Sequence, residues 1–207
     1  MIINQLSGLY QPDRNTVILR FGSDDDVRNG EYYVRGGICW PVAVRNSDGG
    51  SAVGHSVVVG FNLQSKLYTV FEDNEFVCVD PIVEGGRLTF EGVASWFNTC
   101  WARYYCRYWY HHQDETTHRT YLMQVVRSKM IEPKPGFIEI PWTDEKAVAP
   151  VFWRLVNTKR LKFTSPAIMD QAGQYQASLG AEMAMFPAVY ALTCALVAME
   201  RWPWRER

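Results

Sequence analysis

A valine-rich apolar run occupies residues 54–61 (GHSVVVGF), with a histidine near its start. Apolar β-branched residues over this length, bounded by turn residues, favour a buried β-strand. Two further apolar runs follow, and the second of them ends in Asp80. A histidine at the mouth of one strand and an aspartate at the end of another can bring together a base and the carboxylate that orients it. We therefore predict His55 as a general base and Asp80 as its orienting partner.

Apolar and β-branched runs predict several other strands. They lie at residues 16–21, 31–35, 38–44, 107–112, 119–126 and 136–140, with a hairpin formed by 67–71 and 76–79. Helical spacing of apolar residues predicts helices over residues 90–104 and 143–157, and a long buried helix over 180–201. Because strands come first and helices are concentrated later, we predict an α+β fold with a mainly antiparallel sheet packed by helices. We treat residues 1–207 as one domain that ends in a helical segment at 141–207.

The composition is that of a globular protein near neutrality. Apolar residues make up 47% of the 207 residues and aromatic residues 14%, which is enough for a large core. A net charge of −1 gives no overall attraction for nucleic acid. The five cysteines include no repeated CxxC pair, and the N-terminus has no signal-peptide pattern. These features favour a reducing, intracellular location or a virion, and we expect no cofactor.

Residues 37–110 resemble the His/Asp half of the papain-like cysteine peptidase fold, in its bacteriocin-processing C39 peptidase-like branch. The matching elements are PVAV at 41–44, GHSVVVG at 54–60, Asp80-Pro81, LTFE at 88–91 and Trp96. The resemblance implies a papain-like fold, permuted or not, with His55 in the position of the base and Asp80 in that of the orienting residue.

The nucleophile of that family, a cysteine at the start of a buried helix, has no clear counterpart. Cys39 is the one cysteine before His55, and it lies in a predicted strand, which favours packing over catalysis. Ser178, at the entrance of the predicted final helix, is either a replacement nucleophile or a helix N-cap. We favour a non-catalytic structural or binding protein on a papain-like scaffold, as a component of a larger assembly such as a viral or phage particle. The alternative is a permuted papain-like thiol hydrolase or acyl transferase that uses His55 and Asp80.

The segment 101–110 mixes aromatic and basic residues. Such mixtures pack against sheets, form protein-binding surfaces or stack on single-stranded bases. The candidate binding residues are Trp101, Arg103, Arg107 and Trp109. We predict protein partners or self-assembly rather than nucleic acid. Nucleic-acid binding would require Arg103, Arg107 and the basic run at 154–162 to share one exposed face, and strong salt dependence would be its signature.

Two remaining patterns have ordinary explanations. His111, His112 and His118 suggest a metal cluster, but adjacent strand residues point to opposite faces, so we predict no metal site. Residues 183–199 carry no charge, yet they are Ala-rich and interrupted by Pro187. We therefore favour a buried or inter-subunit helix, kinked near Pro187, over a membrane span.

Overall fold

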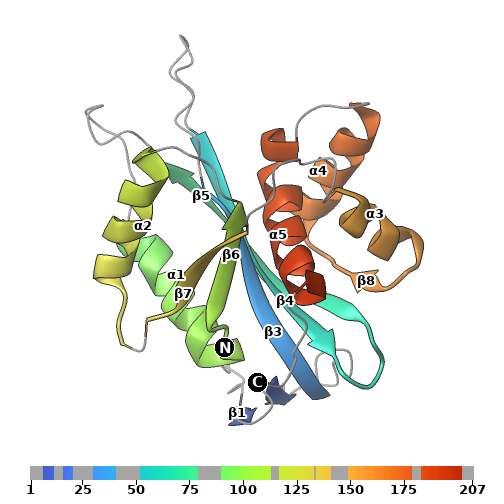
Figure 1. Cartoon of the computed structure of the whole chain (residues 1–207), viewed down its shortest axis with the longest axis horizontal. Helices are drawn as coiled ribbons and strands as arrows, with labels where there is room; N and C mark the ends of the chain where they lie inside the picture. The colour runs from blue at the N-terminus through green and yellow to red at the C-terminus, as the bar shows by residue number, and fades with distance from the viewer. Residues whose placement is uncertain are drawn as a thin grey trace, which may run out of the picture.

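A mixed β-sheet separates two layers of helices (Figure 1). The computed structural model describes residues 7–11, 16–20, 30–40, 52–78, 90–112, 117–132, 134–140, 149–178 and 183–201. The strands are β1 (Ser7–Gln11), β2 (Thr16–Arg20), β3 (Gly30–Cys39), β4 (Ala52–Asn62), β5 (Tyr68–Cys78), β6 (Tyr108–His112), β7 (Gly136–Ile140) and β8 (Leu161–Lys162). The helices are α1 (Phe90–Tyr104), α2 (Thr117–Lys129), α3 (Ala149–Asn157), α4 (Pro166–Ala177) and α5 (Pro187–Arg201), with a 3-10 turn, η2, at Met183–Met185. Helices α1 and α2 cover one face of the sheet, and α3, α4 and α5 cover the other (Figure 1).

The strand order is β1-β2-β3-β4-β5-β8. Neighbours from β1 to β5 are antiparallel, whereas β8 is parallel to β5. Strand β6 runs parallel to β3 along the edge that β2 also uses, and β7 is parallel to β6. The predicted sheet packed by helices is thus confirmed, but three of its pairings are parallel rather than antiparallel.

Two local predictions are wrong. Residues 119–126, predicted as a strand, belong to helix α2, which contacts α1 and buries Val126; Met130, just after the helix, is buried as well. The predicted hairpin over 67–71 and 76–79 is the single strand β5, because β4 pairs with it along almost its whole length. The predicted helix over 90–104 is confirmed as α1.

Helix α5 lies directly on the sheet. Its small residues Ala188, Ala191, Ala195 and Ala198 recur at helical spacing and are fully buried. A Cβ atom added to Gly37 of β3 would lie 1.9 Å from the backbone oxygen of Ala191, so only glycine permits this approach. The helix begins at Pro187, whose fixed φ suits a first helical position. The predicted continuous helix over 180–201 with a kink is therefore wrong, since η2 and α5 are separate elements.

The alternation of strand side chains creates one hydrophobic core on each face of the sheet. Tyr32, Val34 and Ile38 of β3 join the core that includes α1, while Tyr33 and Cys39 join the core that includes α5. No described helix is long and apolar enough to cross a membrane.

Candidate functional site

A β-bulge in β5 sets the direction of Asp73. Val58 of β4 is opposite Glu72 but Val59 is opposite Val70, so one residue of β5, Phe71, is extra at this point. A bulge of this kind shifts the alternation of side chains between the two faces. Phe71 and Glu72 accordingly both face α1, where the Phe71 ring stacks 5.3 Å from the Tyr104 ring and the Tyr104 hydroxyl donates to Glu72 at 2.6 Å. Asp73 consequently points to the α4 side.

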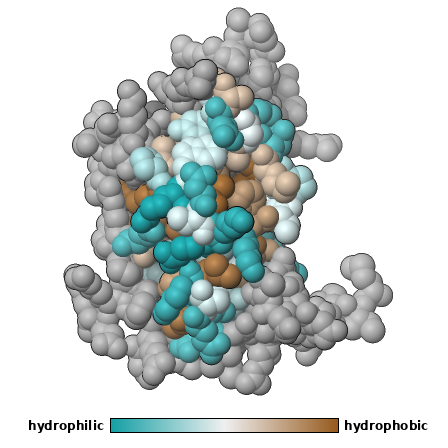
Figure 2. Space-filling model, turned by 90° about the vertical axis from the view of Figure 1, so that its right-hand side faces the viewer, coloured by the Kyte–Doolittle hydropathy of each residue, from teal (hydrophilic) through white to brown (hydrophobic). Residues whose placement is uncertain are grey.

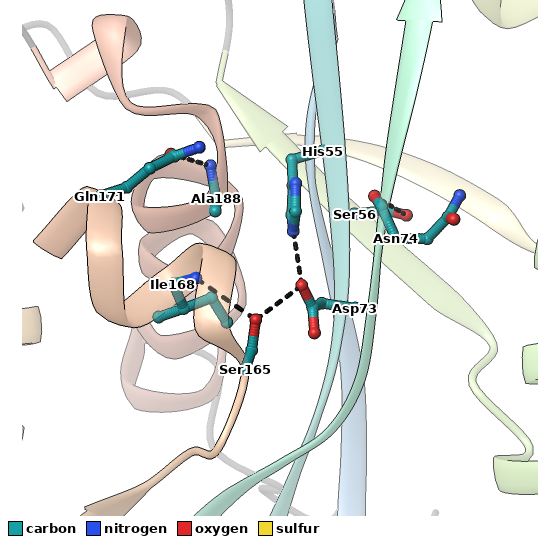
Figure 3. A network of polar contacts seen from close by, with 8 residues as sticks. All are labelled: His55, Ser56, Asp73, Asn74, Ser165, Ile168, Gln171 and Ala188. Carbon is teal, nitrogen blue, oxygen red and sulfur yellow. Dashed lines mark hydrogen bonds and ion pairs between the residues drawn. The ribbon is translucent and has the colours of Figure 1, made fainter.

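On that side, Asp73 joins His55 and Ser165 in a polar network, the His55 network (Figure 3). His55 Nε2 lies 2.9 Å from Asp73 Oδ2, and the Ser165 hydroxyl donates to the same oxygen at 2.8 Å. Ser165 also caps the N-terminus of α4 by accepting from the N–H of Ile168. The network therefore connects two strands of the sheet to the start of a helix.

The electrostatics of the His55 network favour an ionised Asp73. Burial alone would raise the pKa of Asp73, but hydrogen bonds from His55 and Ser165, with the charge of His55, lower it below its usual range. An ionised carboxylate accepts from Nε2–H, which leaves Nδ1 of a neutral His55 as a proton acceptor. His55 is 1% exposed, and its Nδ1 has no hydrogen-bond partner among the described residues. The contact with Asp73 can orient His55 as a base, and the hydrogen bond from Ser165 to Asp73 also attaches the start of α4 to the sheet.

The other predicted catalytic residues are placed as follows. Cys39 of β3 is directly opposite His55 of β4, and such pairs have Cβ atoms about 4.5–5.5 Å apart. Its buried thiol lies 3.8 Å from the Trp40 carbonyl. Ser178 ends α4 and donates to the Tyr175 carbonyl at 2.7 Å. Asp80 lies outside the described residues, so its role stays a prediction, and the carboxylate that contacts His55 is Asp73.

The aromatic and basic residues of 101–110 do not form one surface. Trp109 is fully buried, with its ring 4.4 Å from that of Phe97. Arg103 is 43% exposed and pairs with Glu72 at 2.8 Å. The guanidinium of Arg107 lies 5.7 Å from the ring of Trp101. A binding role for Trp101, Arg103 and Arg107 stays a prediction.

A group of basic residues, the basic corner, forms at the far side of the sheet. It comes from the β4–β5 turn, α3, the turn after α3, and β8, and comprises Lys66, Arg154, Lys159, Arg160 and Lys162. Arg160 Nη2 donates to the Lys66 carbonyl at 3.2 Å, and the Tyr68 N–H donates to the Arg160 carbonyl at 2.8 Å. Residues far apart in the sequence thus meet at one place. Figure 2 shows this side of the molecule, with hydrophilic residues gathered between hydrophobic ones.

Acidic residues offset only part of the charge of the basic corner. Arg154 forms an ion pair with Glu200 of α5. Lys159 and Lys162 are exposed and have no carboxylate partner within the described part of the chain. Arg103 belongs to α1, which covers the opposite face of the sheet from α3 (Figure 1). Arg103 and the basic run at 154–162 therefore do not share the single exposed face considered from the sequence. Lys66 instead lies beside that run.

The described residues contain no group of three or more His, Cys, Asp or Glu side chains able to hold a metal ion. His111 is buried at 1% exposure in β6. His118 is the second residue of helix α2, which begins at Thr117, so it does not lie on a strand with His111.

No protein-family model and no curated protein matches the chain. Among solved structures, the chain is similar to the Mn-soaked human cytomegalovirus terminase nuclease domain, at 12% identity over 80% of this chain and 82% of that one, with a TM-score of 0.49. It is also similar to the fowlpox virus Holliday junction resolvase, at 7% identity over 81% of this chain and 99% of that one, with a TM-score of 0.41. Both similarities concern the arrangement of helices and strands alone.

The papain-like prediction is wrong, because the structure is one mixed sheet with helices on both faces and Cys39 lies on strand β3 rather than at the start of a helix. The matching sequence elements were short strand and helix-start patterns that occur in many folds. The scaffold, hydrolase and structural-protein predictions built on that resemblance are wrong with it, as is the prediction that nucleic acid is not a partner. The single domain and the reducing location stay predictions.

Proposed function

We propose that this chain binds nucleic acid through the phosphate backbone, using the basic corner. The observation that carries the proposal is that five basic residues from four segments lie around the β5–β8 edge of the sheet. Two of them, Lys159 and Lys162, are exposed and have no carboxylate partner in the described part of the chain. The proposal rests on the basic corner alone, because the similarity to the two solved structures concerns only the fold. Clustered Lys and Arg side chains attract phosphates and release counterions on binding.

Backbone strain gives independent support. Lys66 and Lys159 have φ angles of 60° and 55°, in the left-handed region where glycine or asparagine fits with less strain. Lysine at both positions keeps a charge at the expense of local stability. Strained residues of this kind are found preferentially at functional sites.

The test is DNA binding as a function of salt, with a Lys159→Gln/Lys162→Gln variant. Each phosphate contact contributes about −0.9 to the slope of log K against log salt concentration. We expect the slope to become less negative by about 2 and the affinity at 0.1 M salt to fall by about 60-fold, an upper estimate from the same relation. Both lysines are exposed, so the variant should unfold at the wild-type temperature.

The matched control is Arg127→Gln/Lys129→Gln, which removes two exposed charges from α2 on the opposite side of the sheet. The control should keep the wild-type slope. Equal losses in both double variants would show that binding follows net charge and would refute a site at the basic corner. A Lys159→Gly variant separates strain from binding, because it should bind DNA more weakly while unfolding at an equal or higher temperature.

The probes are a duplex and a four-way DNA junction, the latter because one of the similar structures is a Holliday junction resolvase. Two-metal nucleases hold their ions on clustered carboxylates, and the described residues do not supply such a cluster. The proposal is accordingly one of binding. Incubating each DNA with the protein and Mg²⁺ or Mn²⁺ in the same assays would reveal cleavage and extend the proposal.

A further inference from the structure

Arg35 of β3 is a buried cation. It is 5% exposed and faces the α5 side of the sheet, as Tyr33 does two residues earlier. Three tyrosines surround it, Tyr33 of β3 with Tyr108 and Tyr110 of β6, and we call this group the tyrosine cage. The guanidinium carbon lies 3.9 Å from the centre of the Tyr33 ring and 5.4 Å from that of Tyr108.

The charge of Arg35 is not balanced by any described group. One guanidinium nitrogen donates to the Val34 carbonyl at 2.8 Å, and another donates to the Tyr33 hydroxyl. Burial raises the pKa of Tyr33 and of Tyr110, although Arg35 acts in the opposite direction, so both phenols are neutral. No described carboxylate forms an ion pair with Arg35. Arginine keeps its proton at all working pH values, so a full positive charge is buried there.

One donor of Arg35 is also unused. Its Nε–H is buried and has no hydrogen-bond partner among the described residues. Buried charges in proteins are normally paired, and a buried donor left without an acceptor is costly. The Nε edge of a guanidinium is the part that, with a neighbouring Nη, holds an oxyanion by two parallel hydrogen bonds.

We propose that Arg35 and the tyrosine cage bind a phosphate group. A phosphate would supply the missing negative charge and an acceptor for Nε–H, and phenolic hydroxyls are suitable additional donors to its oxygens. Tyr108 is the partly exposed member of the cage, so it is the side from which a ligand would have to reach Arg35. This site is separate from the basic corner and does not depend on it.

The test uses inorganic phosphate as the probe. The unfolding temperature of the wild type is measured in phosphate and in chloride at equal ionic strength, and binding is measured by calorimetry. We expect a rise of about 5–10 °C at phosphate concentrations about 100 times Kd. Arg35→Lys keeps the charge but removes the Nε fork, so it should lower the affinity by at least about 10-fold.

The basic-corner variant Lys159→Gln/Lys162→Gln serves as the control and should keep the full phosphate effect. A phosphate effect that survives in Arg35→Lys, or that disappears in the basic-corner variant, overturns the proposal. Absence of any effect in the wild type does so as well. If Arg35→Lys does not fold, the Nε–H proton signal of Arg35 in the wild type decides the matter by NMR. It must shift on addition of phosphate, and an unchanged signal refutes the site.

Discussion

Replacing Gly37 by alanine tests the close approach of α5 to β3. The added Cβ would lie 1.9 Å from the Ala191 oxygen, whereas ordinary contact begins at 3.4 Å, so α5 must move by about 1.5 Å. The neighbour is helix backbone and cannot rotate away as a side chain would. Overpacking costs about 1–3 kcal/mol, and removing glycine from a strand returns about 0.5–1 kcal/mol. We expect a net loss of about 1–2 kcal/mol, which lowers the unfolding temperature by about 2–8 °C.

Gly173→Ala is the matched control. Gly173 is exposed in α4, and a Cβ added there meets no atom within 4 Å. Alanine should therefore stabilise the helix by about 0.5–1 kcal/mol. Urea and thermal unfolding of both variants give the two free energies of unfolding with opposite signs. A Gly37→Ala protein as stable as the wild type would refute the packing of α5 on β3, whatever the control does.

Two further predictions concern buried polar groups. Asp73→Asn should lose about 1–3 kcal/mol at pH 7, because His55 and Ser165 lose their charged acceptor, whereas Asp170→Asn should lose almost nothing. The pKa of Asp73 is lower in the folded than in the unfolded protein. Its contribution to the free energy of unfolding is therefore complete above the unfolded pKa of about 3.9, and it is lost as pH falls through the folded pKa. Urea unfolding between pH 2 and 7 should show that the free energy of unfolding falls less steeply with decreasing pH in Asp73→Asn than in the wild type. An equally steep fall in both proteins would contradict this. Burial raises the pKa of Cys106 to about 12 and also raises that of Cys100, so iodoacetamide at pH 8 should label both far more slowly in native than in denatured protein. Rapid native labelling of either cysteine, followed by mass spectrometry, would contradict their burial.

The helix at 90–104 was predictable because its buried residues Val93, Phe97, Cys100 and Tyr104 recur at helical spacing in the sequence. Residues 119–126 were wrongly predicted as a strand because their local pattern did not match the structure they form. They contain β-branched valines, which favour strands, but contacts between α1 and α2 outweigh that weak local preference. Parallel pairing of β6 with β3 was also beyond prediction, since local patterns do not specify which distant strands pair.

The sequence predicted His55 as a general base oriented by Asp80, and the structure gives His55 the carboxylate of Asp73 as its partner. That partner was not predictable by strand alternation. Without the bulge, Asp73 would share a face with Phe71 and point to α1, away from His55. A one-residue irregularity, invisible in the sequence, therefore decides which acid contacts the histidine.

The net charge of −1 led to the wrong conclusion about nucleic acid because it averages over the whole surface. Attraction of a phosphate backbone depends on charge within about one Debye length, roughly 8–10 Å at physiological salt. The β5–β8 pairing brings Lys162 beside Thr69, close to the turn that carries Lys66, although these lysines are almost a hundred residues apart. Glu200 pairs with Arg154, but Lys159 and Lys162 have no carboxylate partner in the part of the chain that the structure describes. The proposed binding surface therefore depends on the fold, and removing Lys159 and Lys162 tests it more directly than any change in overall charge.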